Sequence, residues 1–268
     1  MSERIINIIS NSNFESRKTT KDLIKKLRQA GFSPTTKLSN QAELTITVGG
    51  DGAFIKAVNR SKFSEIPIVG VNTGTLGFFQ EISPQALDEF IEAYKKGDYT
   101  LDPLSLIGAE IFTKKRRYFV HAVNEVVVKA KNSKVIHLNV FIDHSHVEKF
   151  SGDGMMVSTA AGSTGYSLSL GGALIYPKLE VLCLTPMAPI LNQAYRSLNN
   201  SIIVPGQLII SLVPEKRYTN STLLVVDGNE YAYSQLQRIN LRLASKKINK
   251  LVVSDQSYWE NLKSKFLI

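Results

Sequence analysis

The residues with the clearest chemistry are Gly49-Gly50-Asp51-Gly52, which follow the apolar run 44–48 and precede a helical pattern. Glycines let the backbone turn sharply and bring N–H groups against a ligand, and a helix N-terminus adds partial positive charge, so such a loop favours phosphate oxygens. The carboxylate of Asp51 would repel phosphate unless it bound Mg²⁺ or accepted a proton from an attacking hydroxyl. The alternative is a plain turn in which Asp51 caps the helix.

A second glycine segment, GVNTGTLGFF (70–79), also ends an apolar run. Ligands of open α/β sheets bind at the carboxyl ends of the strands, so both segments are candidates for one site. We expect Asn72 to face the ligand and Phe78 and Phe79 to lie in the core.

Asn124 and Glu125 interrupt the apolar strand pattern of residues 123–128. A carboxylate inside such a strand is costly unless it is exposed or hydrogen-bonded. The amide could read an adenine edge and the carboxylate could hold ribose hydroxyls. A Glu125 that merely faces solvent on a two-sided sheet fits the pattern equally well.

Residues 150–177 are the densest stretch of Gly, Ser and Thr, and Asp153 is their one charged side chain. Apolar residues such as Met155, Met156 and Leu168 argue against a flexible linker, so we predict a ligand cradle. The four histidines show no metal-binding pattern: His144 and His146 are typical of a solvated turn. Cys183 is expected to be a buried small hydrophobe rather than a nucleophile.

The elements that must position these residues fall into two classes. Strands at 5–10, 44–48 and 66–72 alternate with helical patterns at 19–31, 53–60 and 83–97, and a polar stretch at 11–16 follows the first strand. Short β-rich segments follow. We predict an α/β (Rossmann-like) domain at 1–101 and an all-β sandwich-like domain at 102–251. A helix at about 252–268, with Trp259, Leu262 and Phe266 on one side, is expected to pack on the first domain.

Composition limits the class of protein. The chain has 268 residues, a formal charge of +9 and one cysteine. It is therefore not a disulfide scaffold, and it has no apolar run long enough to span a membrane, so we expect a soluble, cytoplasmic protein. The positive charge suits a polyanionic partner, but the basic segments lack the aromatic platform of a nucleic-acid binder. We expect small-molecule nucleotides as ligands, and neither nucleic acid nor membrane as a partner.

In their order and spacing, these motifs resemble the NAD kinases, which make NADP. The similarity runs from about Ile46 to Pro177, with weaker similarity at PMAPI (186–190) and VVDGNE (225–230). It implies an α/β domain followed by a β-sandwich, and a homo-oligomer, either dimer or tetramer. It also implies NAD as substrate, ATP or polyphosphate as phosphoryl donor, and a divalent metal, expected to be Mg²⁺, whose ligands remain unassigned.

The resemblance also implies roles for residues of this sequence. Asp51, beside Gly50 and Gly52, is implied to be the general base for the adenosine 2′-hydroxyl. Asn124 and Glu125 are implied to hold the adenosine of NAD, and Asp153 to lie at the nicotinamide end. The segment implied to wrap the dinucleotide, with Tyr166 against it, comprises Ser163, Thr164, Gly165, Tyr166, Ser167, Leu168 and Ser169.

Three residues depart from the family pattern: Ala53 replaces a common Thr, Gly165 a common Ala, and Ser151 a common Arg. The last change removes a cation, and Lys149 is the candidate to replace it. Two other functions remain open. A lipid kinase of the diacylglycerol or sphingosine type shares the GGDG loop, although it needs an apolar pocket. A non-catalytic sensor would bind NAD without transferring phosphate.

Overall fold

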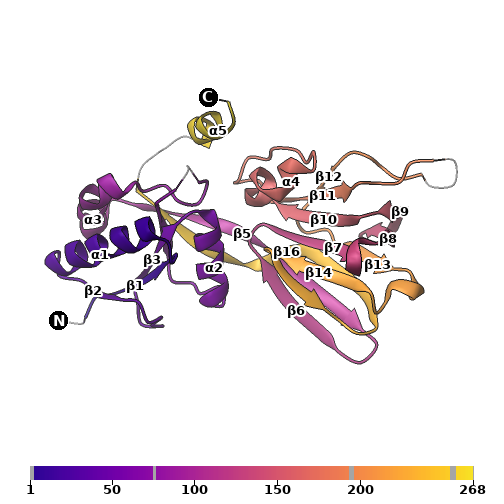
Figure 1. The fold of residues 1–268 in the computed structure, drawn as a ribbon, viewed down its shortest axis with the longest axis horizontal. Helices are drawn as coiled ribbons and strands as arrows, with labels where there is room; N and C mark the ends of the chain where they lie inside the picture. Colours follow the sequence, from indigo (N-terminus) through magenta and orange to yellow (C-terminus); the bar gives the residue numbers. More distant parts are fainter. Residues whose placement is uncertain (1–2, 75–76, 193–195, 254–257, 268) are drawn as a thin grey trace. The chain divides into compact units, whose positions relative to one another are not determined.

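The computed structural model describes residues 3–74, 77–192, 196–253 and 258–267. The chain divides into two compact units, which Figure 1 colours along the sequence. Unit 1 comprises Met1–Pro103 and Ile248–Ile268, and unit 2 comprises Leu104–Lys247. Unit 1 is therefore discontinuous in sequence.

Unit 1 is built on a parallel sheet with strand order β2-β1-β3-β4, and the last part of β16 pairs with β4, also in parallel. Figure 1 shows α1 and α3 on one face of this sheet and α2 on the other. The parallel α/β prediction is confirmed. The elements are β1 (Ile5–Ser10), α1 (Phe14–Gln29), β2 (Ser33–Thr35), β3 (Leu44–Gly49), α2 (Asp51–Arg60), β4 (Ile68–Asn72), η1 (Pro84–Ala86), α3 (Leu87–Lys96) and α5 (Tyr258–Phe266).

The start of α1 differs from our expectation. The helix begins at Phe14, before the predicted start at Thr19, because the side chain of Asn13 accepts a hydrogen bond from Ser16 N at 2.8 Å and caps it. Every residue of β3 is buried, and Ile6, Leu44 and Leu23 of the sheet and α1 form the core. The sheet's carboxyl ends thereby become a fixed platform for the loops that follow them.

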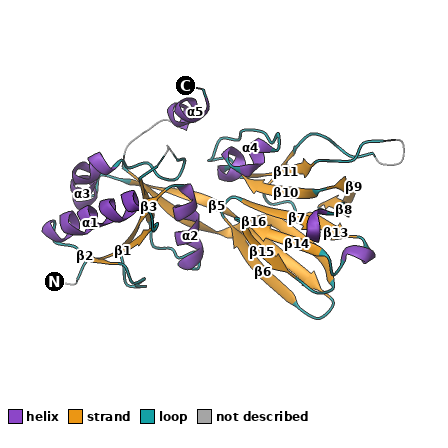
Figure 2. Cartoon of the chain, in the orientation of Figure 1, coloured by secondary structure: helices purple, strands orange, loops and turns teal. Residues whose placement is uncertain are grey.

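Unit 2 consists of two antiparallel sheets, drawn as the strand-rich part of Figure 2. One sheet has the order β12-β11-β10-β7-β14-β15, and the other joins β5, β6, β8, β9, β13 and β16. Both sheets contribute side chains to one core, so the β-sandwich prediction is confirmed. The strands are β5 (Thr100–Thr113), β6 (Arg117–Ala122), β7 (Glu125–Ala130), β8 (Ile136–Ile142), β9 (Ser145–Gly152), β10 (Gly154–Thr159), β11 (Val181–Met187), β12 (Ile202–Pro205), β13 (Ile210–Pro214), β14 (Thr222–Val226), β15 (Asn229–Ala232) and β16 (Leu236–Val252).

Short helices of unit 2 are η2 (Lys131–Ser133), η3 (Ala161–Thr164), α4 (Tyr166–Ser169) and η4 (Lys216–Tyr218). Cys183 is buried and unpaired by disulfide, as predicted, and His144 and His146 are exposed. Among the described residues, no helix combines the length and apolar character needed to cross a bilayer.

Candidate functional site

Asp51 is the first residue of α2, and its carboxylate is held by the second glycine segment. Oδ2 accepts a hydrogen bond from Phe78 N and Oδ1 one from Phe79 N, each at 2.9 Å. Gly77 makes room for this contact, because a Cβ there would lie 2.3 Å from Oδ1. The helix N-cap position belongs to Gly50, without a side-chain cap bond, so Asp51 does not cap α2. The two glycine segments form one cradle around one carboxylate.

The cradle is tied together through backbone groups. Thr73 N donates to Gly49 O at 3.1 Å, which links the ends of β3 and β4. Gly49 has a φ of +156°, and a Cβ there would lie 2.7 Å from the Cβ of Ala53. The backbone of the loop and the small residue in α2 are therefore fitted to each other.

Gln80, which the sequence analysis did not select, completes the cradle. This fully buried side chain donates from Nε2 to Gly50 O at 2.9 Å, and its Oε1 accepts from Thr47 Oγ1 at 3.2 Å. The signal in the sequence was a glutamine directly after two phenylalanines expected in the core. A buried amide side chain needs hydrogen-bond partners, so such a glutamine indicates a structural contact. Gln80 fixes the carbonyl orientation of the GGDG loop.

Phe79 lies in the core, stacked on Phe54 with ring centroids 4.8 Å apart, whereas Phe78 is only partly buried. The expectation that both phenylalanines belong to the core therefore holds for Phe79 alone. Lys265 of α5 approaches the same cradle: its Nζ lies 3.6 Å from Asp51 Oδ2.

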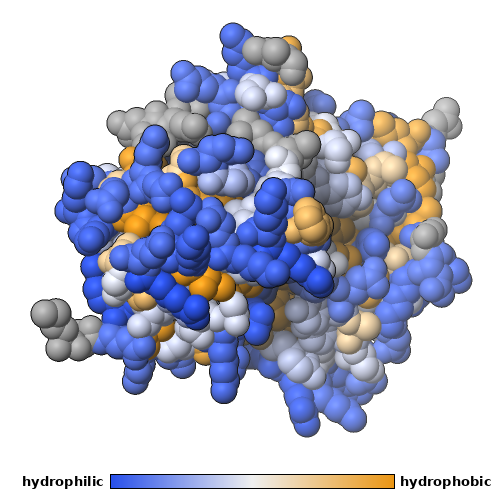
Figure 3. Space-filling model, turned by 60° about the vertical axis from the view of Figure 1, so that its left-hand side comes forward, coloured by the Kyte–Doolittle hydropathy of each residue, from blue (hydrophilic) through white to orange (hydrophobic). Residues whose placement is uncertain are grey.

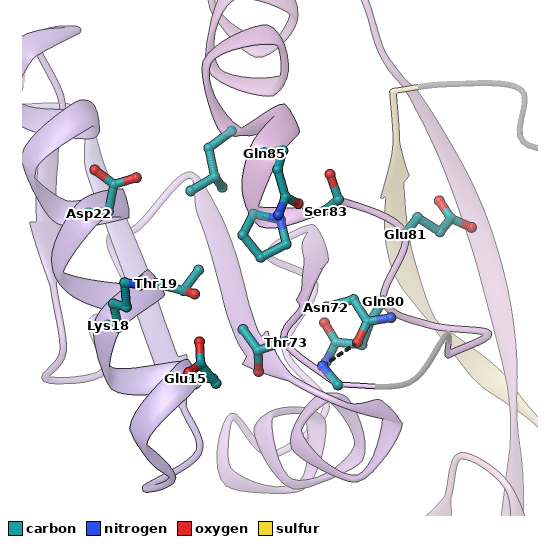
Figure 4. A pocket seen from close by; sticks show the side chains of 13 residues that line it. Glu15, Lys18, Thr19, Asp22, Asn72, Thr73, Gln80, Glu81, Ser83 and Gln85 are labelled. Carbon is teal, nitrogen blue, oxygen red and sulfur yellow. Dashed lines mark hydrogen bonds between the residues drawn. The ribbon is translucent and has the colours of Figure 1, made fainter.

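Asn72 lies at the carboxyl end of β4 and borders a pocket of about 720 Å³ in unit 1 (Figure 4). Its Oδ1 accepts a hydrogen bond from Gly74 N at 3.0 Å. The walls come from α1 and from the segment after β4, and their side chains include Glu15, Lys18, Thr19, Asp22, Asn72, Thr73, Gln80, Glu81, Ser83 and Gln85. Amide, hydroxyl and mixed charged groups make the pocket suitable for a polar ligand.

Asn124 and Glu125 lie at the start of β7 in unit 2, and Asp227 holds the backbone there. The carboxylate of Asp227 accepts hydrogen bonds from Val123 N and Asn124 N at 2.8 Å and from Glu125 N at 3.3 Å. Asp227 and Gly228 have φ values of +46° and +80° and form the two-residue turn between β14 and β15. The turn therefore orients the pair that the sequence analysis selected.

Glu125 is not a simple solvent-facing residue of its sheet. Burial, together with the nearby charge of Asp227, raises the pKa of Glu125 to about 7. The Oδ1 of Asn124 is buried and has no hydrogen-bond partner among the described residues. A carboxyl group that can donate or accept near neutral pH, beside an unsatisfied amide oxygen, indicates a ligand site.

The segment 161–169 packs against this pair. Gly162 lies against the backbone of Asn124, where a Cβ would come within 2.3 Å of its carbonyl oxygen, and a Cβ at Gly165 would lie 3.7 Å from Asn124 Nδ2. The Ser163 hydroxyl donates to Ala160 O at 2.7 Å and accepts from Ile175 N at 3.0 Å, so it holds the local backbone.

The other members of the segment differ in exposure. Tyr166 is 48% exposed, and the hydroxyl of Ser169 donates to its carbonyl oxygen at 2.7 Å. Ser167 is fully buried, and its Oγ has no partner among the described residues. Thr164 and Leu168 are partly buried. The exposed ring and the unsatisfied hydroxyl are the groups of this segment with capacity for a ligand.

Asp153 is exposed between β9 and β10, and its backbone N–H donates to Met187 O at 3.0 Å. Ser151 is buried, and its Oγ lies 2.6 Å from His137 Nδ1. Lys149 forms an ion pair with Glu215 at 2.6 Å. The ammonium group of Lys149 is therefore paired with the carboxylate of Glu215. This pairing argues against the idea that Lys149 replaces the cation missing at Ser151.

No cluster of three or more metal-ligating His, Cys, Asp or Glu side chains exists among the described residues. Asp51 is the carboxylate of the glycine cradle. A single carboxylate is compatible with a Mg²⁺ ion whose remaining coordination would come from phosphate oxygens and water. Protein-bound Mg²⁺ commonly keeps several waters and uses only one or two carboxylates.

Comparison with known proteins decides the family. Residues 8–99 match the family model of the ATP-NAD kinase N-terminal domain, and residues 123–254 match that of the ATP-NAD kinase C-terminal domain. An NAD kinase of Finegoldia magna is 40% identical over 268 residues, with 98% of both chains covered. The chain belongs to the NAD kinase family.

Other family members support this assignment at lower identity. An NAD kinase of Streptococcus mutans serotype c is 32% identical, with 97% of this chain and 94% of the relative covered. A yeast NADH kinase complexed with NADH superposes with a TM-score of 0.84 at 18% identity over 98% of this chain and 87% of its own. An Archaeoglobus fulgidus NAD kinase in complex with ATP gives 0.75 at 21% identity over 97% and 99%. These two structures confirm the fold. The lipid-kinase alternative is not favoured.

Proposed function

We propose that this chain transfers the γ-phosphoryl group of ATP to the 2′-hydroxyl of the adenosine ribose of NAD, which gives NADP. The carrying observation is Asp51, a carboxylate oriented by two backbone N–H groups at the start of a helix. The membership in the NAD kinase family supplies the substrate and the reaction. Polyphosphate is the alternative donor.

Asp51 acts as the general base. A secondary hydroxyl is a poor nucleophile, so it must be placed in line with the phosphoryl group and lose its proton as the bond forms. Oδ2 accepts from Phe78 N and also lies 3.6 Å from Lys265 Nζ, whereas Oδ1 accepts from Phe79 N and retains a lone-pair direction for the hydroxyl proton. The glycine loop offers backbone N–H groups to phosphate oxygens.

Asn124 and Glu125 hold the adenosine part of NAD. The unsatisfied Oδ1 of Asn124 accepts from the amino group of the base, and Glu125 hydrogen-bonds to ribose hydroxyls. Tyr166, with Thr164, Ser167 and Leu168 of the same segment, contacts the dinucleotide, and Asp153 serves its nicotinamide end. Asp227 orients the backbone of the pair.

Asp51 is the protein carboxylate that would contact a Mg²⁺ ion bound to the phosphoryl donor, and the charge of such an ion would neutralise phosphate oxygens. We further propose that the protein is cytoplasmic and forms homo-oligomers. Its exposed apolar residues in unit 2, among them Leu191 and Ile203, support self-association.

The substitution Asp51→Asn tests the assignment of the base. We expect NADP formation to fall by about 10²-fold or more, the contribution typical of a positioned base, while NAD binding is retained. The measurement is NADP formation from NAD with ATP or polyphosphate, with and without Mg²⁺, beside NAD binding by calorimetry. Full turnover in the variant would refute the role of Asp51. Tight NAD binding by the wild type with no phosphorylated product would favour the sensor.

A further inference from the structure

The peptide of Phe78 has contacts on several sides, all within unit 1. Its N–H donates to Asp51, and its carbonyl oxygen accepts from Lys250 Nζ at 3.4 Å. Lys250, near the end of β16, also forms an ion pair with Glu81, and both side chains are largely buried. The group that orients Asp51 is therefore itself held by a residue 172 positions away in the sequence.

The helix α5 contacts the ring of the same residue. The ring centroids of Tyr258 and Phe266 lie 6.0 and 5.9 Å from that of Phe78. Lys265 Nζ lies 4.5 Å from the Phe78 centroid and 3.6 Å from Asp51 Oδ2. One ammonium group thus contacts both the carboxylate and the residue that donates to it.

These contacts restrict how the carboxylate can turn. With Phe78 N and Lys265 Nζ both directed at Oδ2, and Phe79 N at Oδ1, the plane of the carboxylate is fixed. Loss of the ammonium group would leave Phe78 N as the partner of Oδ2. It would also remove the cation that contacts the Phe78 ring.

We propose that Lys265 and Phe266 of α5 are positioning residues for the general base, so that α5 belongs to the catalytic apparatus rather than serving as a terminal appendage. Lys265 acts on the Asp51 carboxylate directly, and Phe266 acts through the Phe78 ring. This proposal rests on the role of Asp51 proposed above.

The test is steady-state kinetics of the full chain, with NAD and ATP varied separately. We expect Lys265→Met to lower kcat about tenfold, because the carboxylate of the general base would be less well positioned. The KM for NAD should stay within about twofold of the wild-type value. Lys265→Arg should restore most of kcat, because it keeps a cation there. Phe266→Ala should lower kcat in the same way, whereas Phe266→Leu should lower it less.

Lys263→Met is the matched control, because Lys263 lies exposed on the same helix and its side chain forms no ion pair or hydrogen bond with the cradle residues that the structure describes. It should leave kcat unchanged. A Lys265→Met variant with wild-type kcat, or one that Arg does not rescue, would overturn the proposal. Thermal unfolding identifies a variant that has lost activity because it is misfolded. If the lower activity of Lys265→Met were explained by a lower Tm, the proposal would also be overturned. An active Asp51→Asn variant would instead refute the base, so the two failures are distinguishable.

Discussion

At the scale of single residues, the decisive feature of the cradle is the space that Gly77 leaves for Asp51. The sequence marked Asp51 as chemically unusual, because a carboxylate is out of place in an anion-binding loop. It did not reveal that Phe78 and Phe79 supply the N–H groups that hold it, since this contact spans 27 residues and depends on how β3 and β4 pair.

We expect Gly77→Ala to lower kcat by about 10²-fold, because its Cβ would displace a carboxylate oxygen now 2.3 Å away by about an ångström. Gly74→Ala, in the same segment, meets nothing within 4 Å and should cost far less. Parallel assays of NADP formation compare the two. Equal losses would show that flexibility of the segment, rather than space at Asp51, limits activity.

Glu125 predicts a pH dependence of stability. Burial in the fold raises the pKa of Glu125 to about 7, so the folded protein favours the neutral carboxyl group. The free energy of unfolding therefore decreases as pH rises from 4.5, the ordinary pKa of the group, through 7. The loss is at most about 3 kcal/mol. Glu125→Gln cannot ionise, so its Tm should exceed that of wild type at pH 8 and match it near pH 4.5.

The same substitution should weaken substrate binding. Glutamine replaces one carboxyl oxygen by an NH₂ group, and loss of a hydrogen bond to ribose should raise the KM for NAD about tenfold. A Tm difference that is constant with pH would contradict the raised pKa, and an unchanged KM would contradict the ribose contact. The two measurements separate these claims.

At the scale of elements, the turn between β14 and β15 matters most. The tripeptide Val226-Asp227-Gly228 reads as an ordinary hairpin turn, and its side-chain partners at residues 123–125 cannot be inferred from local sequence because they lie on another strand. The beginning of α1 shows the opposite case: Asn13 was a cap signal present in the sequence, and the polar character of residues 11–16 obscured it.

Asp227→Asn should raise the KM for NAD about tenfold, because one amide oxygen cannot accept all three N–H bonds and its NH₂ group faces a donor. It should also lower the pKa of Glu125 by removing a like charge, which flattens the dependence of Tm on pH. Glu230→Gln removes an exposed charge from the same hairpin and is the control. Matching kinetics in the two variants would show that charge alone is responsible.

At the scale of the whole molecule, periodicity was sufficient to predict both fold classes, since buried parallel strands and alternating antiparallel strands differ in pattern. An apolar helix face led us to expect that the helix at about 252–268 packs on the first domain. Of the residues expected on the packed side, Phe266 contacts the ring of Phe78, as does Tyr258, whereas Trp259 is 62% exposed.

Hydrophilic residues cover most of the face seen in Figure 3, which is consistent with the charge of +9. Unit 2 nevertheless exposes Leu179, Leu191, Leu198 and Ile203, the last on the edge strand β12. We expect light scattering to give a mass of two or four chains and Ile203→Asp to reduce it. A wild-type protein that stays monomeric at micromolar concentration would contradict self-association.

The division of unit 1 between the two ends of the sequence has a consequence for biosynthesis. While the ribosome is still translating residues 104–247, the emerged α/β segment lacks the strand that pairs with β4, the buried Leu251 and the lysine that holds the Phe78 carbonyl. The Asp51 loop cannot be completed until residues 248–266 leave the exit tunnel. A nascent chain that ends before residue 248 therefore carries the GGDG sequence without an assembled base, and we expect catalytic competence only after residues 248–266 have been synthesised.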